Sequence, residues 1–297
     1  MERIDLHMHS TFSDGALDIG SLLKEVRKRN IGVVSVADHE TIIGLTGYEK
    51  AMKEYDLKII PAIEMNVSLS GAHILGYGVS NFKMVEDAFD KIKVNNENIV
   101  FDIIKFLKKE GVMIDEYDVV ESTMEYHNKK KLIVEGNSDI FKYQKKFIIL
   151  KTDIARTMVE LGIVSSIDDA YRRYLNNDSK KYCIKTNKIS TKDAIELIDR
   201  SGGITVLAHL MTVNTRKYSL INICKDLKRI GLSGIEVDGN RYSENQTEYY
   251  KNIAAKLNFI QTVGSDFHRM DQNMGFLCSS RVVNNLEKKI KEKRLGY

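Results

Sequence analysis

The stretch that decides the fold lies near the N-terminus and reads Asp5-Leu6-His7-Met8-His9-Ser10-Thr11-Phe12-Ser13-Asp14-Gly15. His7 and His9 stand two residues apart in an apolar run typical of a β-strand, so both side chains project from the same face of the strand. Two imidazoles followed by a carboxylate are unfavourable in a hydrophobic core and well suited to a metal ion. The stretch therefore predicts a strand that ends in metal ligands.

Similar histidines and carboxylates recur further along the chain. Six of the seven histidines and three carboxylates lie on, or soon after, apolar strand-like runs. These nine candidate ligands are His7, His9, Asp14, His39, Glu64, His73, His209, Asp266 and His268. Mixed imidazole and carboxylate ligands suit divalent ions such as zinc, manganese and iron. The sequence thus predicts metal-dependent chemistry.

Strand-like and helical patterns alternate over two parts of the chain. The strand-like runs are 4–9, 33–38, 58–63, 66–69, 73–77, 204–208, 234–238 and 259–264, and the helical ones are 18–29, 41–54, 191–201, 218–230 and 244–257. Repeated strand–helix units favour a parallel sheet, either doubly wound or closed into a barrel. The candidate ligands follow several different strands, as in barrels, and the glycine-rich phosphate loop typical of doubly wound sheets is missing. We therefore expect a distorted barrel.

The middle of the chain has a different character. Residues 84–188 show a mostly helical pattern, and 297 residues suffice for one large core with an inserted lobe. We expect residues 1–83 and 189–297 to form the barrel with the metal site. The insertion 84–188 is expected to be a helical cap or lid.

Composition limits the class of protein. The chain is 43% hydrophobic and 29% charged, and its net charge of +4 permits anionic substrates without demanding nucleic acid. It has no apolar run of roughly 20 residues, the length that a membrane span needs, and it starts directly with a strand-like run rather than a signal peptide. Three isolated cysteines are typical of a reducing compartment. We expect a cytoplasmic enzyme with no membrane association and no obligate protein partner.

The motifs also carry a resemblance to a known family. They are, in chain order, His7-Met8-His9-Ser10, Ser13-Asp14-Gly15, Ala37-Asp38-His39, Ala62-Ile63-Glu64, His73-Ile74-Leu75-Gly76-Tyr77, Leu207-Ala208-His209 and Gly264-Ser265-Asp266-Phe267-His268. This set resembles the polymerase and histidinol phosphatase (PHP) family of metal-dependent phosphoesterases, and it is most similar to the phosphatases of nucleotides and short oligonucleotides. The resemblance implies a distorted (β/α)7 barrel and a centre of two to three metal ions, namely Mn, Zn or Fe.

The resemblance also implies a ligand assignment. The first ion would be held by His7, His9, Glu64 and Asp266. Glu64 would bridge to a second ion held by His73 and His209, and the third would be held by Asp14, His39 and His268. A ligand-competent residue fills each position, which favours an intact trinuclear centre.

The implied reaction is hydrolysis of a phosphate ester by a water that bridges two cations, because such a water has a strongly lowered pKa. Asp266, as both ligand and neighbour of that water, is the candidate proton acceptor. The substrate implied is small and phosphorylated. It is a nucleotide such as a nucleoside 3',5'-bisphosphate, or the 5' end of a short oligonucleotide that an exonuclease would shorten.

Three cationic side chains are expected to bind the substrate. Family members resemble the chain around Arg156, but they carry arginine where this sequence has Lys151. A lysine does not reproduce the bidentate fork that an arginine offers to phosphate. Arg241, which lies where the family has a histidine-rich turn, is the candidate to compensate for that change.

Several alternatives stay open at this point. The substrate class is also compatible with a histidinol-phosphate-type phosphatase, and some PHP modules attached to polymerases are non-catalytic and bind nucleic acid. The Lys-rich stretch 129–151, with Phe141, Tyr143 and Phe147, either attracts nucleic acid or is a solvated loop. Asp5 and Asp38 either orient imidazoles or cap strand ends.

Overall fold

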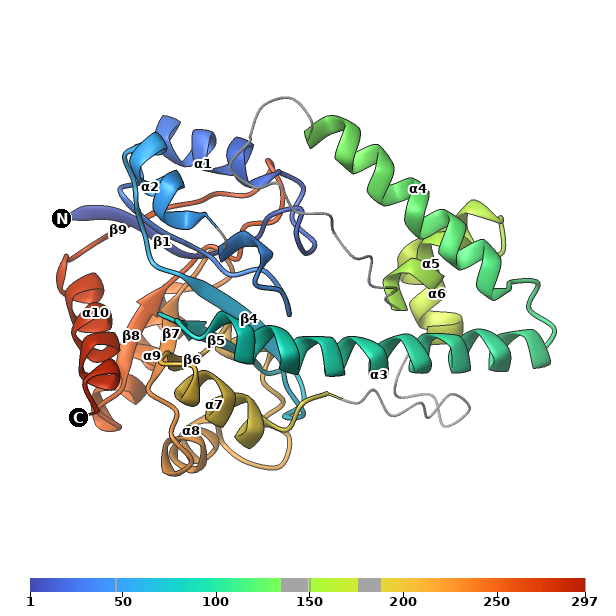
Figure 1. Cartoon of the computed structure of the whole chain (residues 1–297). Helices are drawn as coiled ribbons and strands as arrows, with labels where there is room; N and C mark the ends of the chain where they lie inside the picture. The colour runs from blue at the N-terminus through green and yellow to red at the C-terminus, as the bar shows by residue number, and fades with distance from the viewer. Residues whose placement is uncertain (46, 135–148, 150, 176–187, 297) are drawn as a thin grey trace. The chain divides into compact units, whose positions relative to one another are not determined.

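The computed structural model describes residues 1–45, 47–134, 149, 151–175 and 188–296 (Figure 1). These residues fall into two compact units. The first unit is built from residues 1–88 together with the chain from residue 188 onward. The second unit is built from residues between 89 and 175. All nine predicted metal ligands belong to the first unit.

Two sheets form the centre of the first unit. The four-stranded sheet has the order β3-β2-β1-β9, with β1 Glu2–Met8, β2 Val33–Val36, β3 Lys58–Ile59 and β9 Phe276–Cys278. The five-stranded sheet has the order β4-β5-β6-β7-β8, with β4 Ala62–Asn66, β5 His73–Tyr77, β6 Ile204–Leu207, β7 Gly234–Asp238 and β8 Ile260–Val263. Most neighbours are parallel, but β5 runs antiparallel to both β4 and β6, and β9 runs antiparallel to β1.

The two sheets approach each other just after the ends of β1 and β2. Met8 forms an isolated bridge with Phe267, and His39 forms another with Glu64. The His9 N–H donates to the Phe267 carbonyl at 2.9 Å, and the Glu64 N–H donates to the Asp38 carbonyl at 3.2 Å. The described residues therefore show a mixed α/β fold, as the sequence indicates, but no closed barrel. The (β/α)7 barrel stays a prediction.

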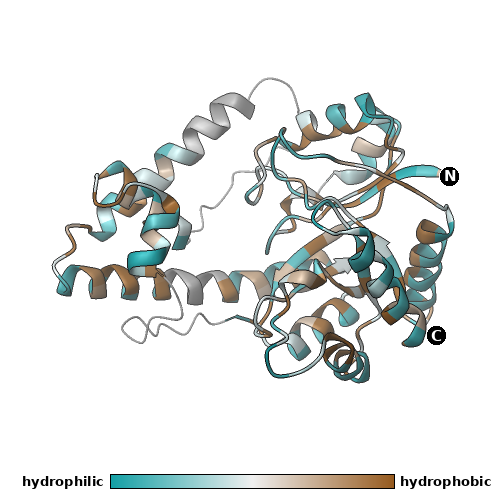
Figure 2. Cartoon of the chain, turned by 180° about the vertical axis from the view of Figure 1, so that it is seen from behind, coloured by the Kyte–Doolittle hydropathy of each residue, from teal (hydrophilic) through white to brown (hydrophobic). Residues whose placement is uncertain are grey.

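Helices flank these sheets. They are α1 Ile19–Lys28, η1 Ile43–Leu45, α2 Tyr48–Tyr55, α7 Thr191–Arg200, η5 Leu210–Thr212, α8 Leu220–Arg229, α9 Glu244–Lys256 and α10 Arg281–Arg294. Side chains cap several of them: Asp18 accepts the Ser21 N–H, and Ser243 forms a capping box with Gln246. The α-helices carry polar and apolar residues together, as the helix leading to the C-terminus in Figure 2 illustrates. Many of the apolar residues are buried, for example Leu22, Leu23 and Val26 of α1 beside Met8 of β1.

The structure corrects several expected element boundaries. The strand expected at 58–63 is two strands in two sheets, because Pro61 has no N–H to donate to a ladder. The helix expected at 41–54 is divided into η1 and α2, and Gly47 precedes α2 with a positive φ of 83°. The strand expected at 66–69 is not formed, since β4 ends at Asn66. The elements β9 and α10 were not expected from the sequence.

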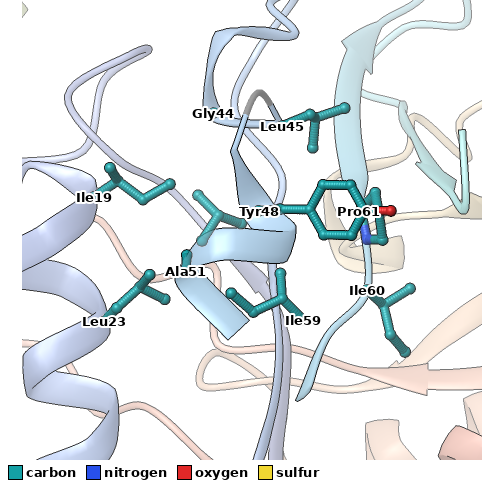
Figure 3. A pocket seen from close by; sticks show the side chains of 10 residues that line it. Ile19, Leu23, Gly44, Leu45, Tyr48, Ala51, Ile59, Ile60 and Pro61 are labelled. Atoms are coloured by element: carbon teal, nitrogen blue, oxygen red, sulfur yellow. The ribbon is translucent and has the colours of Figure 1, made fainter. Parts of the chain in front are cut away.

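A small cavity beneath α2 reflects packing rather than binding. It measures about 10 Å³ and is lined by apolar side chains that include Ile19, Leu23, Leu45 and Ile59 (Figure 3). A space of this size holds at most about one water molecule, and water needs polar partners. This cavity therefore offers no site for a phosphorylated substrate.

The second unit is helical, as the pattern of residues 84–188 predicts. Its elements are α3 Phe82–Lys109, which begins in the first unit, α4 Glu116–Val134, α5 Lys151–Glu160, α6 Ile167–Ala170 and the π-helical turn Tyr171–Leu175. Its own core includes Ile104, Leu107, Ile154 and Met158. The cap or lid role of this insertion stays a prediction. Phe141, Tyr143, Phe147 and most of the Lys-rich stretch lie outside the described residues.

None of the helices that the structure describes combines the length and the apolar character that a bilayer crossing requires.

Candidate metal centre

The structure brings all nine predicted ligands into one cluster at the strand ends of the first unit. Strands β1, β4 and β5 carry His7, Glu64 and His73, and the other six lie in the segments that follow β1, β2, β6 and β8: His9, Asp14, His39, His209, Asp266 and His268. Each of the nine has a side-chain nitrogen or oxygen within 4.0 Å of another member of the set. That they bind metal stays a prediction.

Glu64 lies at the centre of this cluster and is completely buried. Its Oε2 atom faces three imidazole nitrogens at 3.1–3.4 Å, and its Oε1 atom faces two more at 2.9 and 3.0 Å. The imidazoles belong to His7, His9, His39, His73 and His209. One carboxylate is therefore shared by imidazoles from four segments of the chain: the end of β1, the residues after β2, the start of β5 and the residues after β6.

Three overlapping groups in the cluster have the composition of a metal site. Each group offers ligand atoms that all lie within 4.8 Å of one another. The groups are His7–His9–Glu64–Asp266, His9–Asp14–His39–His268 and His39–Glu64–His73. Shared members connect the groups, as expected for neighbouring ions with bridging ligands.

One atom of the cluster indicates that a cation fits there. The His9 Nε2 atom is buried and has no hydrogen-bond partner. It nevertheless faces Glu64 Oε2 at 3.2 Å and Asp266 Oδ1 at 3.3 Å. A buried polar atom without a partner costs about 1–3 kcal/mol. A divalent ion between this nitrogen and the two carboxylates would satisfy all three groups.

The carboxylates of the cluster are held in their ionised form. Burial opposes the ionisation of Asp266, but the close contact with His9 and the charges of His7 and His9 outweigh it and lower the pKa of Asp266. Burial also opposes ionisation of Glu64, and the nearby imidazoles, His7 and His39 first, hold its pKa well below the usual range. Both side chains are thus anionic at neutral pH.

Burial acts in the opposite sense on His39. It lowers the pKa of this histidine to about 4, although Glu64 and Asp14 pull the pKa upward. The imidazole is therefore neutral near pH 7 and keeps a lone pair for a metal ion. For His9, burial lowers the pKa, but the close carboxylates of Asp266 and Glu64 together outweigh burial and raise the pKa to about 9. A metal ion at His9 would displace that proton.

Asp38 and Asp5 support the loops around the cluster rather than its imidazoles. Asp38 accepts the Ser10 N–H at 2.8 Å and hydroxyl hydrogen bonds from Ser10 and Ser13 at 2.7 and 2.6 Å. Asp5 accepts the N–H groups of Ser265 and Gly275 at 3.0 and 2.9 Å. Neither carboxylate has a described hydrogen bond to an imidazole ring, so both act on the loops that carry ligands.

Sequence reasoning missed Glu236, which is 1% exposed in β7. Its Oε1 atom accepts a hydrogen bond from His7 Nδ1 at 3.0 Å, and its Oε2 atom accepts the His209 N–H at 2.8 Å. The signal was present, because Gly234-Ile235-Glu236-Val237 places a charge inside an apolar strand. The same argument identifies Glu64.

Backbone features mark the site as well. A Cβ atom on Gly264 would lie 2.2 Å from His7 Cβ and 2.8 Å from Glu236 Oε1, so glycine allows the end of β8 to approach β1. Two of the predicted ligands, His209 and Asp266, adopt positive φ values of 23° and 53°. Such conformations cost about 1–3 kcal/mol and cluster at functional sites.

The three predicted substrate-binding residues lie in different units. Arg241 follows β7, is 53% exposed by side chain, and places Nη2 3.4 Å from Asp266 Oδ2. In the second unit, Arg156 binds Asp153 at 2.7 Å with its guanidinium 3.7 Å over the Tyr126 ring. Lys151 places Nζ 5.9 Å from the centre of the Tyr171 ring. Only Arg241 is shown beside the cluster, and contact of all three with substrate stays a prediction.

Comparisons with known proteins agree with this site. Residues 5–199 match the PHP domain family. The chain is 27% identical to a 5'-3' exoribonuclease of Haemophilus influenzae over 273 residues, which cover 90% of each chain. It is 23% identical to a 3',5'-nucleoside bisphosphate phosphatase of Chromobacterium violaceum over 273 residues, 90% of this chain and 88% of that one.

A solved structure supports the fold. The Bifidobacterium adolescentis protein assigned as a metal-dependent phosphoesterase superposes with a TM-score of 0.73, at 23% identity and 96% coverage of both chains. This likeness concerns the fold alone. With the family match over residues 5–199, it confirms the resemblance that the motifs carry. The chain belongs to the PHP domain family and is a hydrolase of the metal-dependent phosphoesterase type.

Proposed function

We propose that the protein releases phosphate or a nucleotide from a small phosphorylated substrate, either a nucleoside 3',5'-bisphosphate or the 5' end of a short oligonucleotide. The observation that carries this proposal is the buried Glu64 carboxylate, which faces five imidazoles and belongs to two of the three ligand groups. The names of the Haemophilus influenzae and Chromobacterium violaceum relatives support the substrate class. A cytoplasmic location is part of the proposal.

The proposed cofactor is a set of two to three divalent ions, Mn, Zn or Fe. The first would be held by His7, His9, Glu64 and Asp266, the second by Glu64, His73 and His209, and the third by Asp14, His39 and His268. When bound, such ions acidify water and neutralise charge on the phosphoryl oxygens. The unpartnered His9 Nε2 supports the first of these positions.

The residues around the cluster indicate the nucleophile, the proton acceptor and the group that binds the phosphate. The hydroxyl groups of Ser10 and Ser13 donate to Asp38, so they hold a turn rather than attack the phosphorus atom. Water is therefore the proposed nucleophile. Asp266 is ionised and 14% exposed by side chain, which suits it to accept a proton from that water. The exposed guanidinium of Arg241 would bind a phosphoryl oxygen next to it.

The second unit enters the proposal through its expected role as a cap. Residues 84–188 would exclude water from the bound substrate, and Lys151 and Arg156 would contact its phosphate groups. The neighbouring Asp153 and Tyr126 already fix the Arg156 side chain, which favours binding with a small loss of entropy.

The test measures product release and metal content on the same sample. Protein stripped with a chelator and then reloaded with manganese is offered a nucleoside 3',5'-bisphosphate, a 5'-phosphorylated trinucleotide and histidinol phosphate. We expect metal-dependent release of phosphate from the first or of mononucleotide from the second. The Glu64→Gln variant serves as the inactive reference.

Two results would contradict the proposal. Turnover confined to histidinol phosphate would indicate the amino-alcohol phosphatase function instead. A fully metallated protein that is inert toward every phosphate ester, yet shifts RNA in a salt-dependent gel assay, would indicate a non-catalytic binding module.

A further inference from the structure

One buried carboxylate has no part in the ligand assignment. Glu236 lies in the middle of β7 between the completely buried Ile235 and the 1% exposed Val237. A buried carboxylate is retained only where partners compensate for its lost hydration. The partners of Glu236 are both parts of predicted metal ligands, and the inference below rests on the metal centre proposed above.

The first partner is the ring of His7. A carboxylate only accepts hydrogen bonds, so the contact of 3.0 Å between Glu236 Oε1 and His7 Nδ1 places a proton on Nδ1. The opposite ring atom, Nε2, then points at Glu64 Oε2 at 3.1 Å and Asp266 Oδ1 at 3.7 Å. A hydrogen bond on one imidazole nitrogen fixes the orientation of the other toward a metal ion.

The second partner is the backbone of His209. This residue has a φ of 23° and precedes the short helix η5. Glu236 Oε2 accepts its N–H at 2.8 Å, and the Tyr242 hydroxyl oxygen accepts the next N–H, of Leu210, also at 2.8 Å. Strained backbone persists only where surrounding groups hold it. Here β7 and the segment after it supply those groups.

The strained turn aims the His209 ring at the cluster. His209 Nε2 lies 2.9 Å from Glu64 Oε1, and its Nδ1 lies 2.9 Å from the Thr212 hydroxyl. Because His7 and His209 face different oxygens of Glu64, the two oxygens of Glu236 support ligands on both sides of the central carboxylate.

We propose that Glu236 is a positioning residue that couples two metal positions, fixing the His7 ring for the first ion and the His209 turn for the second. Loss of its side chain then weakens two positions at once. Loss of the Tyr242 hydroxyl weakens only the position that His209 serves.

The experiment compares metal binding in Glu236→Ala, Glu236→Gln, Tyr242→Phe and the wild type. Bound ions per chain are measured by elemental analysis, and dissociation constants by competition with a chelator. The control is Tyr77→Phe, which removes a buried hydrogen bond of 2.8 Å to a backbone carbonyl, that of Leu6. The melting temperatures of the metal-free proteins measure fold stability independently of metal binding.

For Glu236→Ala we expect two dissociation constants to rise about 10- to 100-fold, the usual effect of removing such a partner. Glu236→Gln keeps one acceptor and should weaken binding less. Tyr77→Phe should lower the melting temperature and leave the constants unchanged. In zinc-loaded protein labelled with nitrogen-15, the His7 Nδ1–H signal should shift in the Glu236 variants and not in Tyr77→Phe.

Unchanged dissociation constants and an unchanged His7 signal in Glu236→Gln would overturn the inference while leaving the proposed function intact. Dissociation constants equal to those of the wild type in folded Glu236→Ala would overturn it as well. A wild-type protein that binds no divalent ion would instead overturn the proposed function, and this inference with it.

Discussion

The Glu64 carboxylate shows how a single residue organises the centre. Its charge balances five imidazoles from four segments, and no other carboxylate within the described cluster faces as many imidazoles. An amide of the same shape cannot supply the second acceptor oxygen or the negative charge. The loss of one partner from a buried charged network costs about 3–5 kcal/mol.

We therefore expect Glu64→Gln to reduce bound metal and to lower kcat by roughly 100-fold or more. Elemental analysis and phosphate release measure the two effects. Glu287→Gln is the matched control, because Glu287 forms a half-exposed ion pair with Lys58 away from the cluster. Full metal content and turnover in Glu64→Gln would contradict the assigned role.

Arg241 is the exposed cation beside the cluster, 3.4 Å from Asp266. We expect Arg241→Ala to raise KM for phosphate esters about 10-fold or more with a smaller change in kcat, since a hydrogen bond to a charged group contributes about 1.5–3 kcal/mol. Arg241→Lys should recover only part of the loss, because lysine lacks the bidentate fork.

The control is Arg229→Ala on α8, where the arginine pairs with Asp226 at the surface. Steady-state kinetics on the same phosphate esters give KM and kcat for each variant. An unchanged KM for every ester in Arg241→Ala would exclude Arg241 from substrate binding.

At the residue scale, the sequence predicted the nine clustered side chains because each charged or imidazole group interrupts an apolar strand or follows one. The same argument applies to Glu236, which belongs to none of the motifs that carry the family resemblance. The hydrogen-bond partners of Asp5 and Asp38 could not be predicted from the sequence. They are mainly backbone N–H groups of distant loops, which any residue type provides.

At the scale of elements, helix and strand periodicity predicted most members of the first unit, including β1, β7 and α9. Two of the expected elements are divided at residues that interrupt regular structure. Pro61 separates β3 from β4, and Gly47 separates η1 from α2. The antiparallel direction of β5 follows from its short connection to β4, which is too short for a parallel crossover. The strand β9 spans three residues and pairs with the distant β1, so no local pattern identifies it.

Gly264 lies where the end of β8 comes close to β1. A methyl group there would lie 2.2 Å from His7 Cβ. We expect Gly264→Ala to destabilise the fold by about 1–3 kcal/mol and to weaken metal binding, because the end of β8 and His7 must separate. Thermal unfolding and chelator competition measure both effects.

Gly32→Ala provides the comparison, since a Cβ at Gly32 meets only Glu2 Oε1 at an ordinary 3.4 Å. Equal stability and metal affinity in the two variants would show that the close approach of β8 to β1 has no role in the site.

At the scale of the whole molecule, the nine predicted ligands span residues 7–268 of the chain, so they meet only when the first unit is folded. An ion that binds the folded state alone stabilises it by mass action, by about 4 kcal/mol at 1,000 times its dissociation constant. We expect chelation to lower the melting temperature and manganese or zinc to restore it, as measured by calorimetry. A melting temperature insensitive to both treatments would contradict a centre inside the folded unit.

The sequence predicted the mixed α/β class and the family, and it did so because the order of the motifs is distinctive. The closure of the strands into a barrel is expected from the placement of the candidate ligands after several strands and from the resemblance. The structure shows two sheets that meet through the Met8–Phe267 and His39–Glu64 bridges. Such pairing depends on how strands twist and stagger, which residue patterns do not specify.

The most direct test of the central claim is anomalous diffraction from crystals of the manganese-loaded protein. The account predicts two or three peaks within the cluster, each about 2.0–2.3 Å from imidazole nitrogens and carboxylate oxygens. One of these peaks should contact His9 Nε2, Glu64 and Asp266. Anomalous density confined to other parts of the molecule, with the nine side chains bound only to one another, would contradict it.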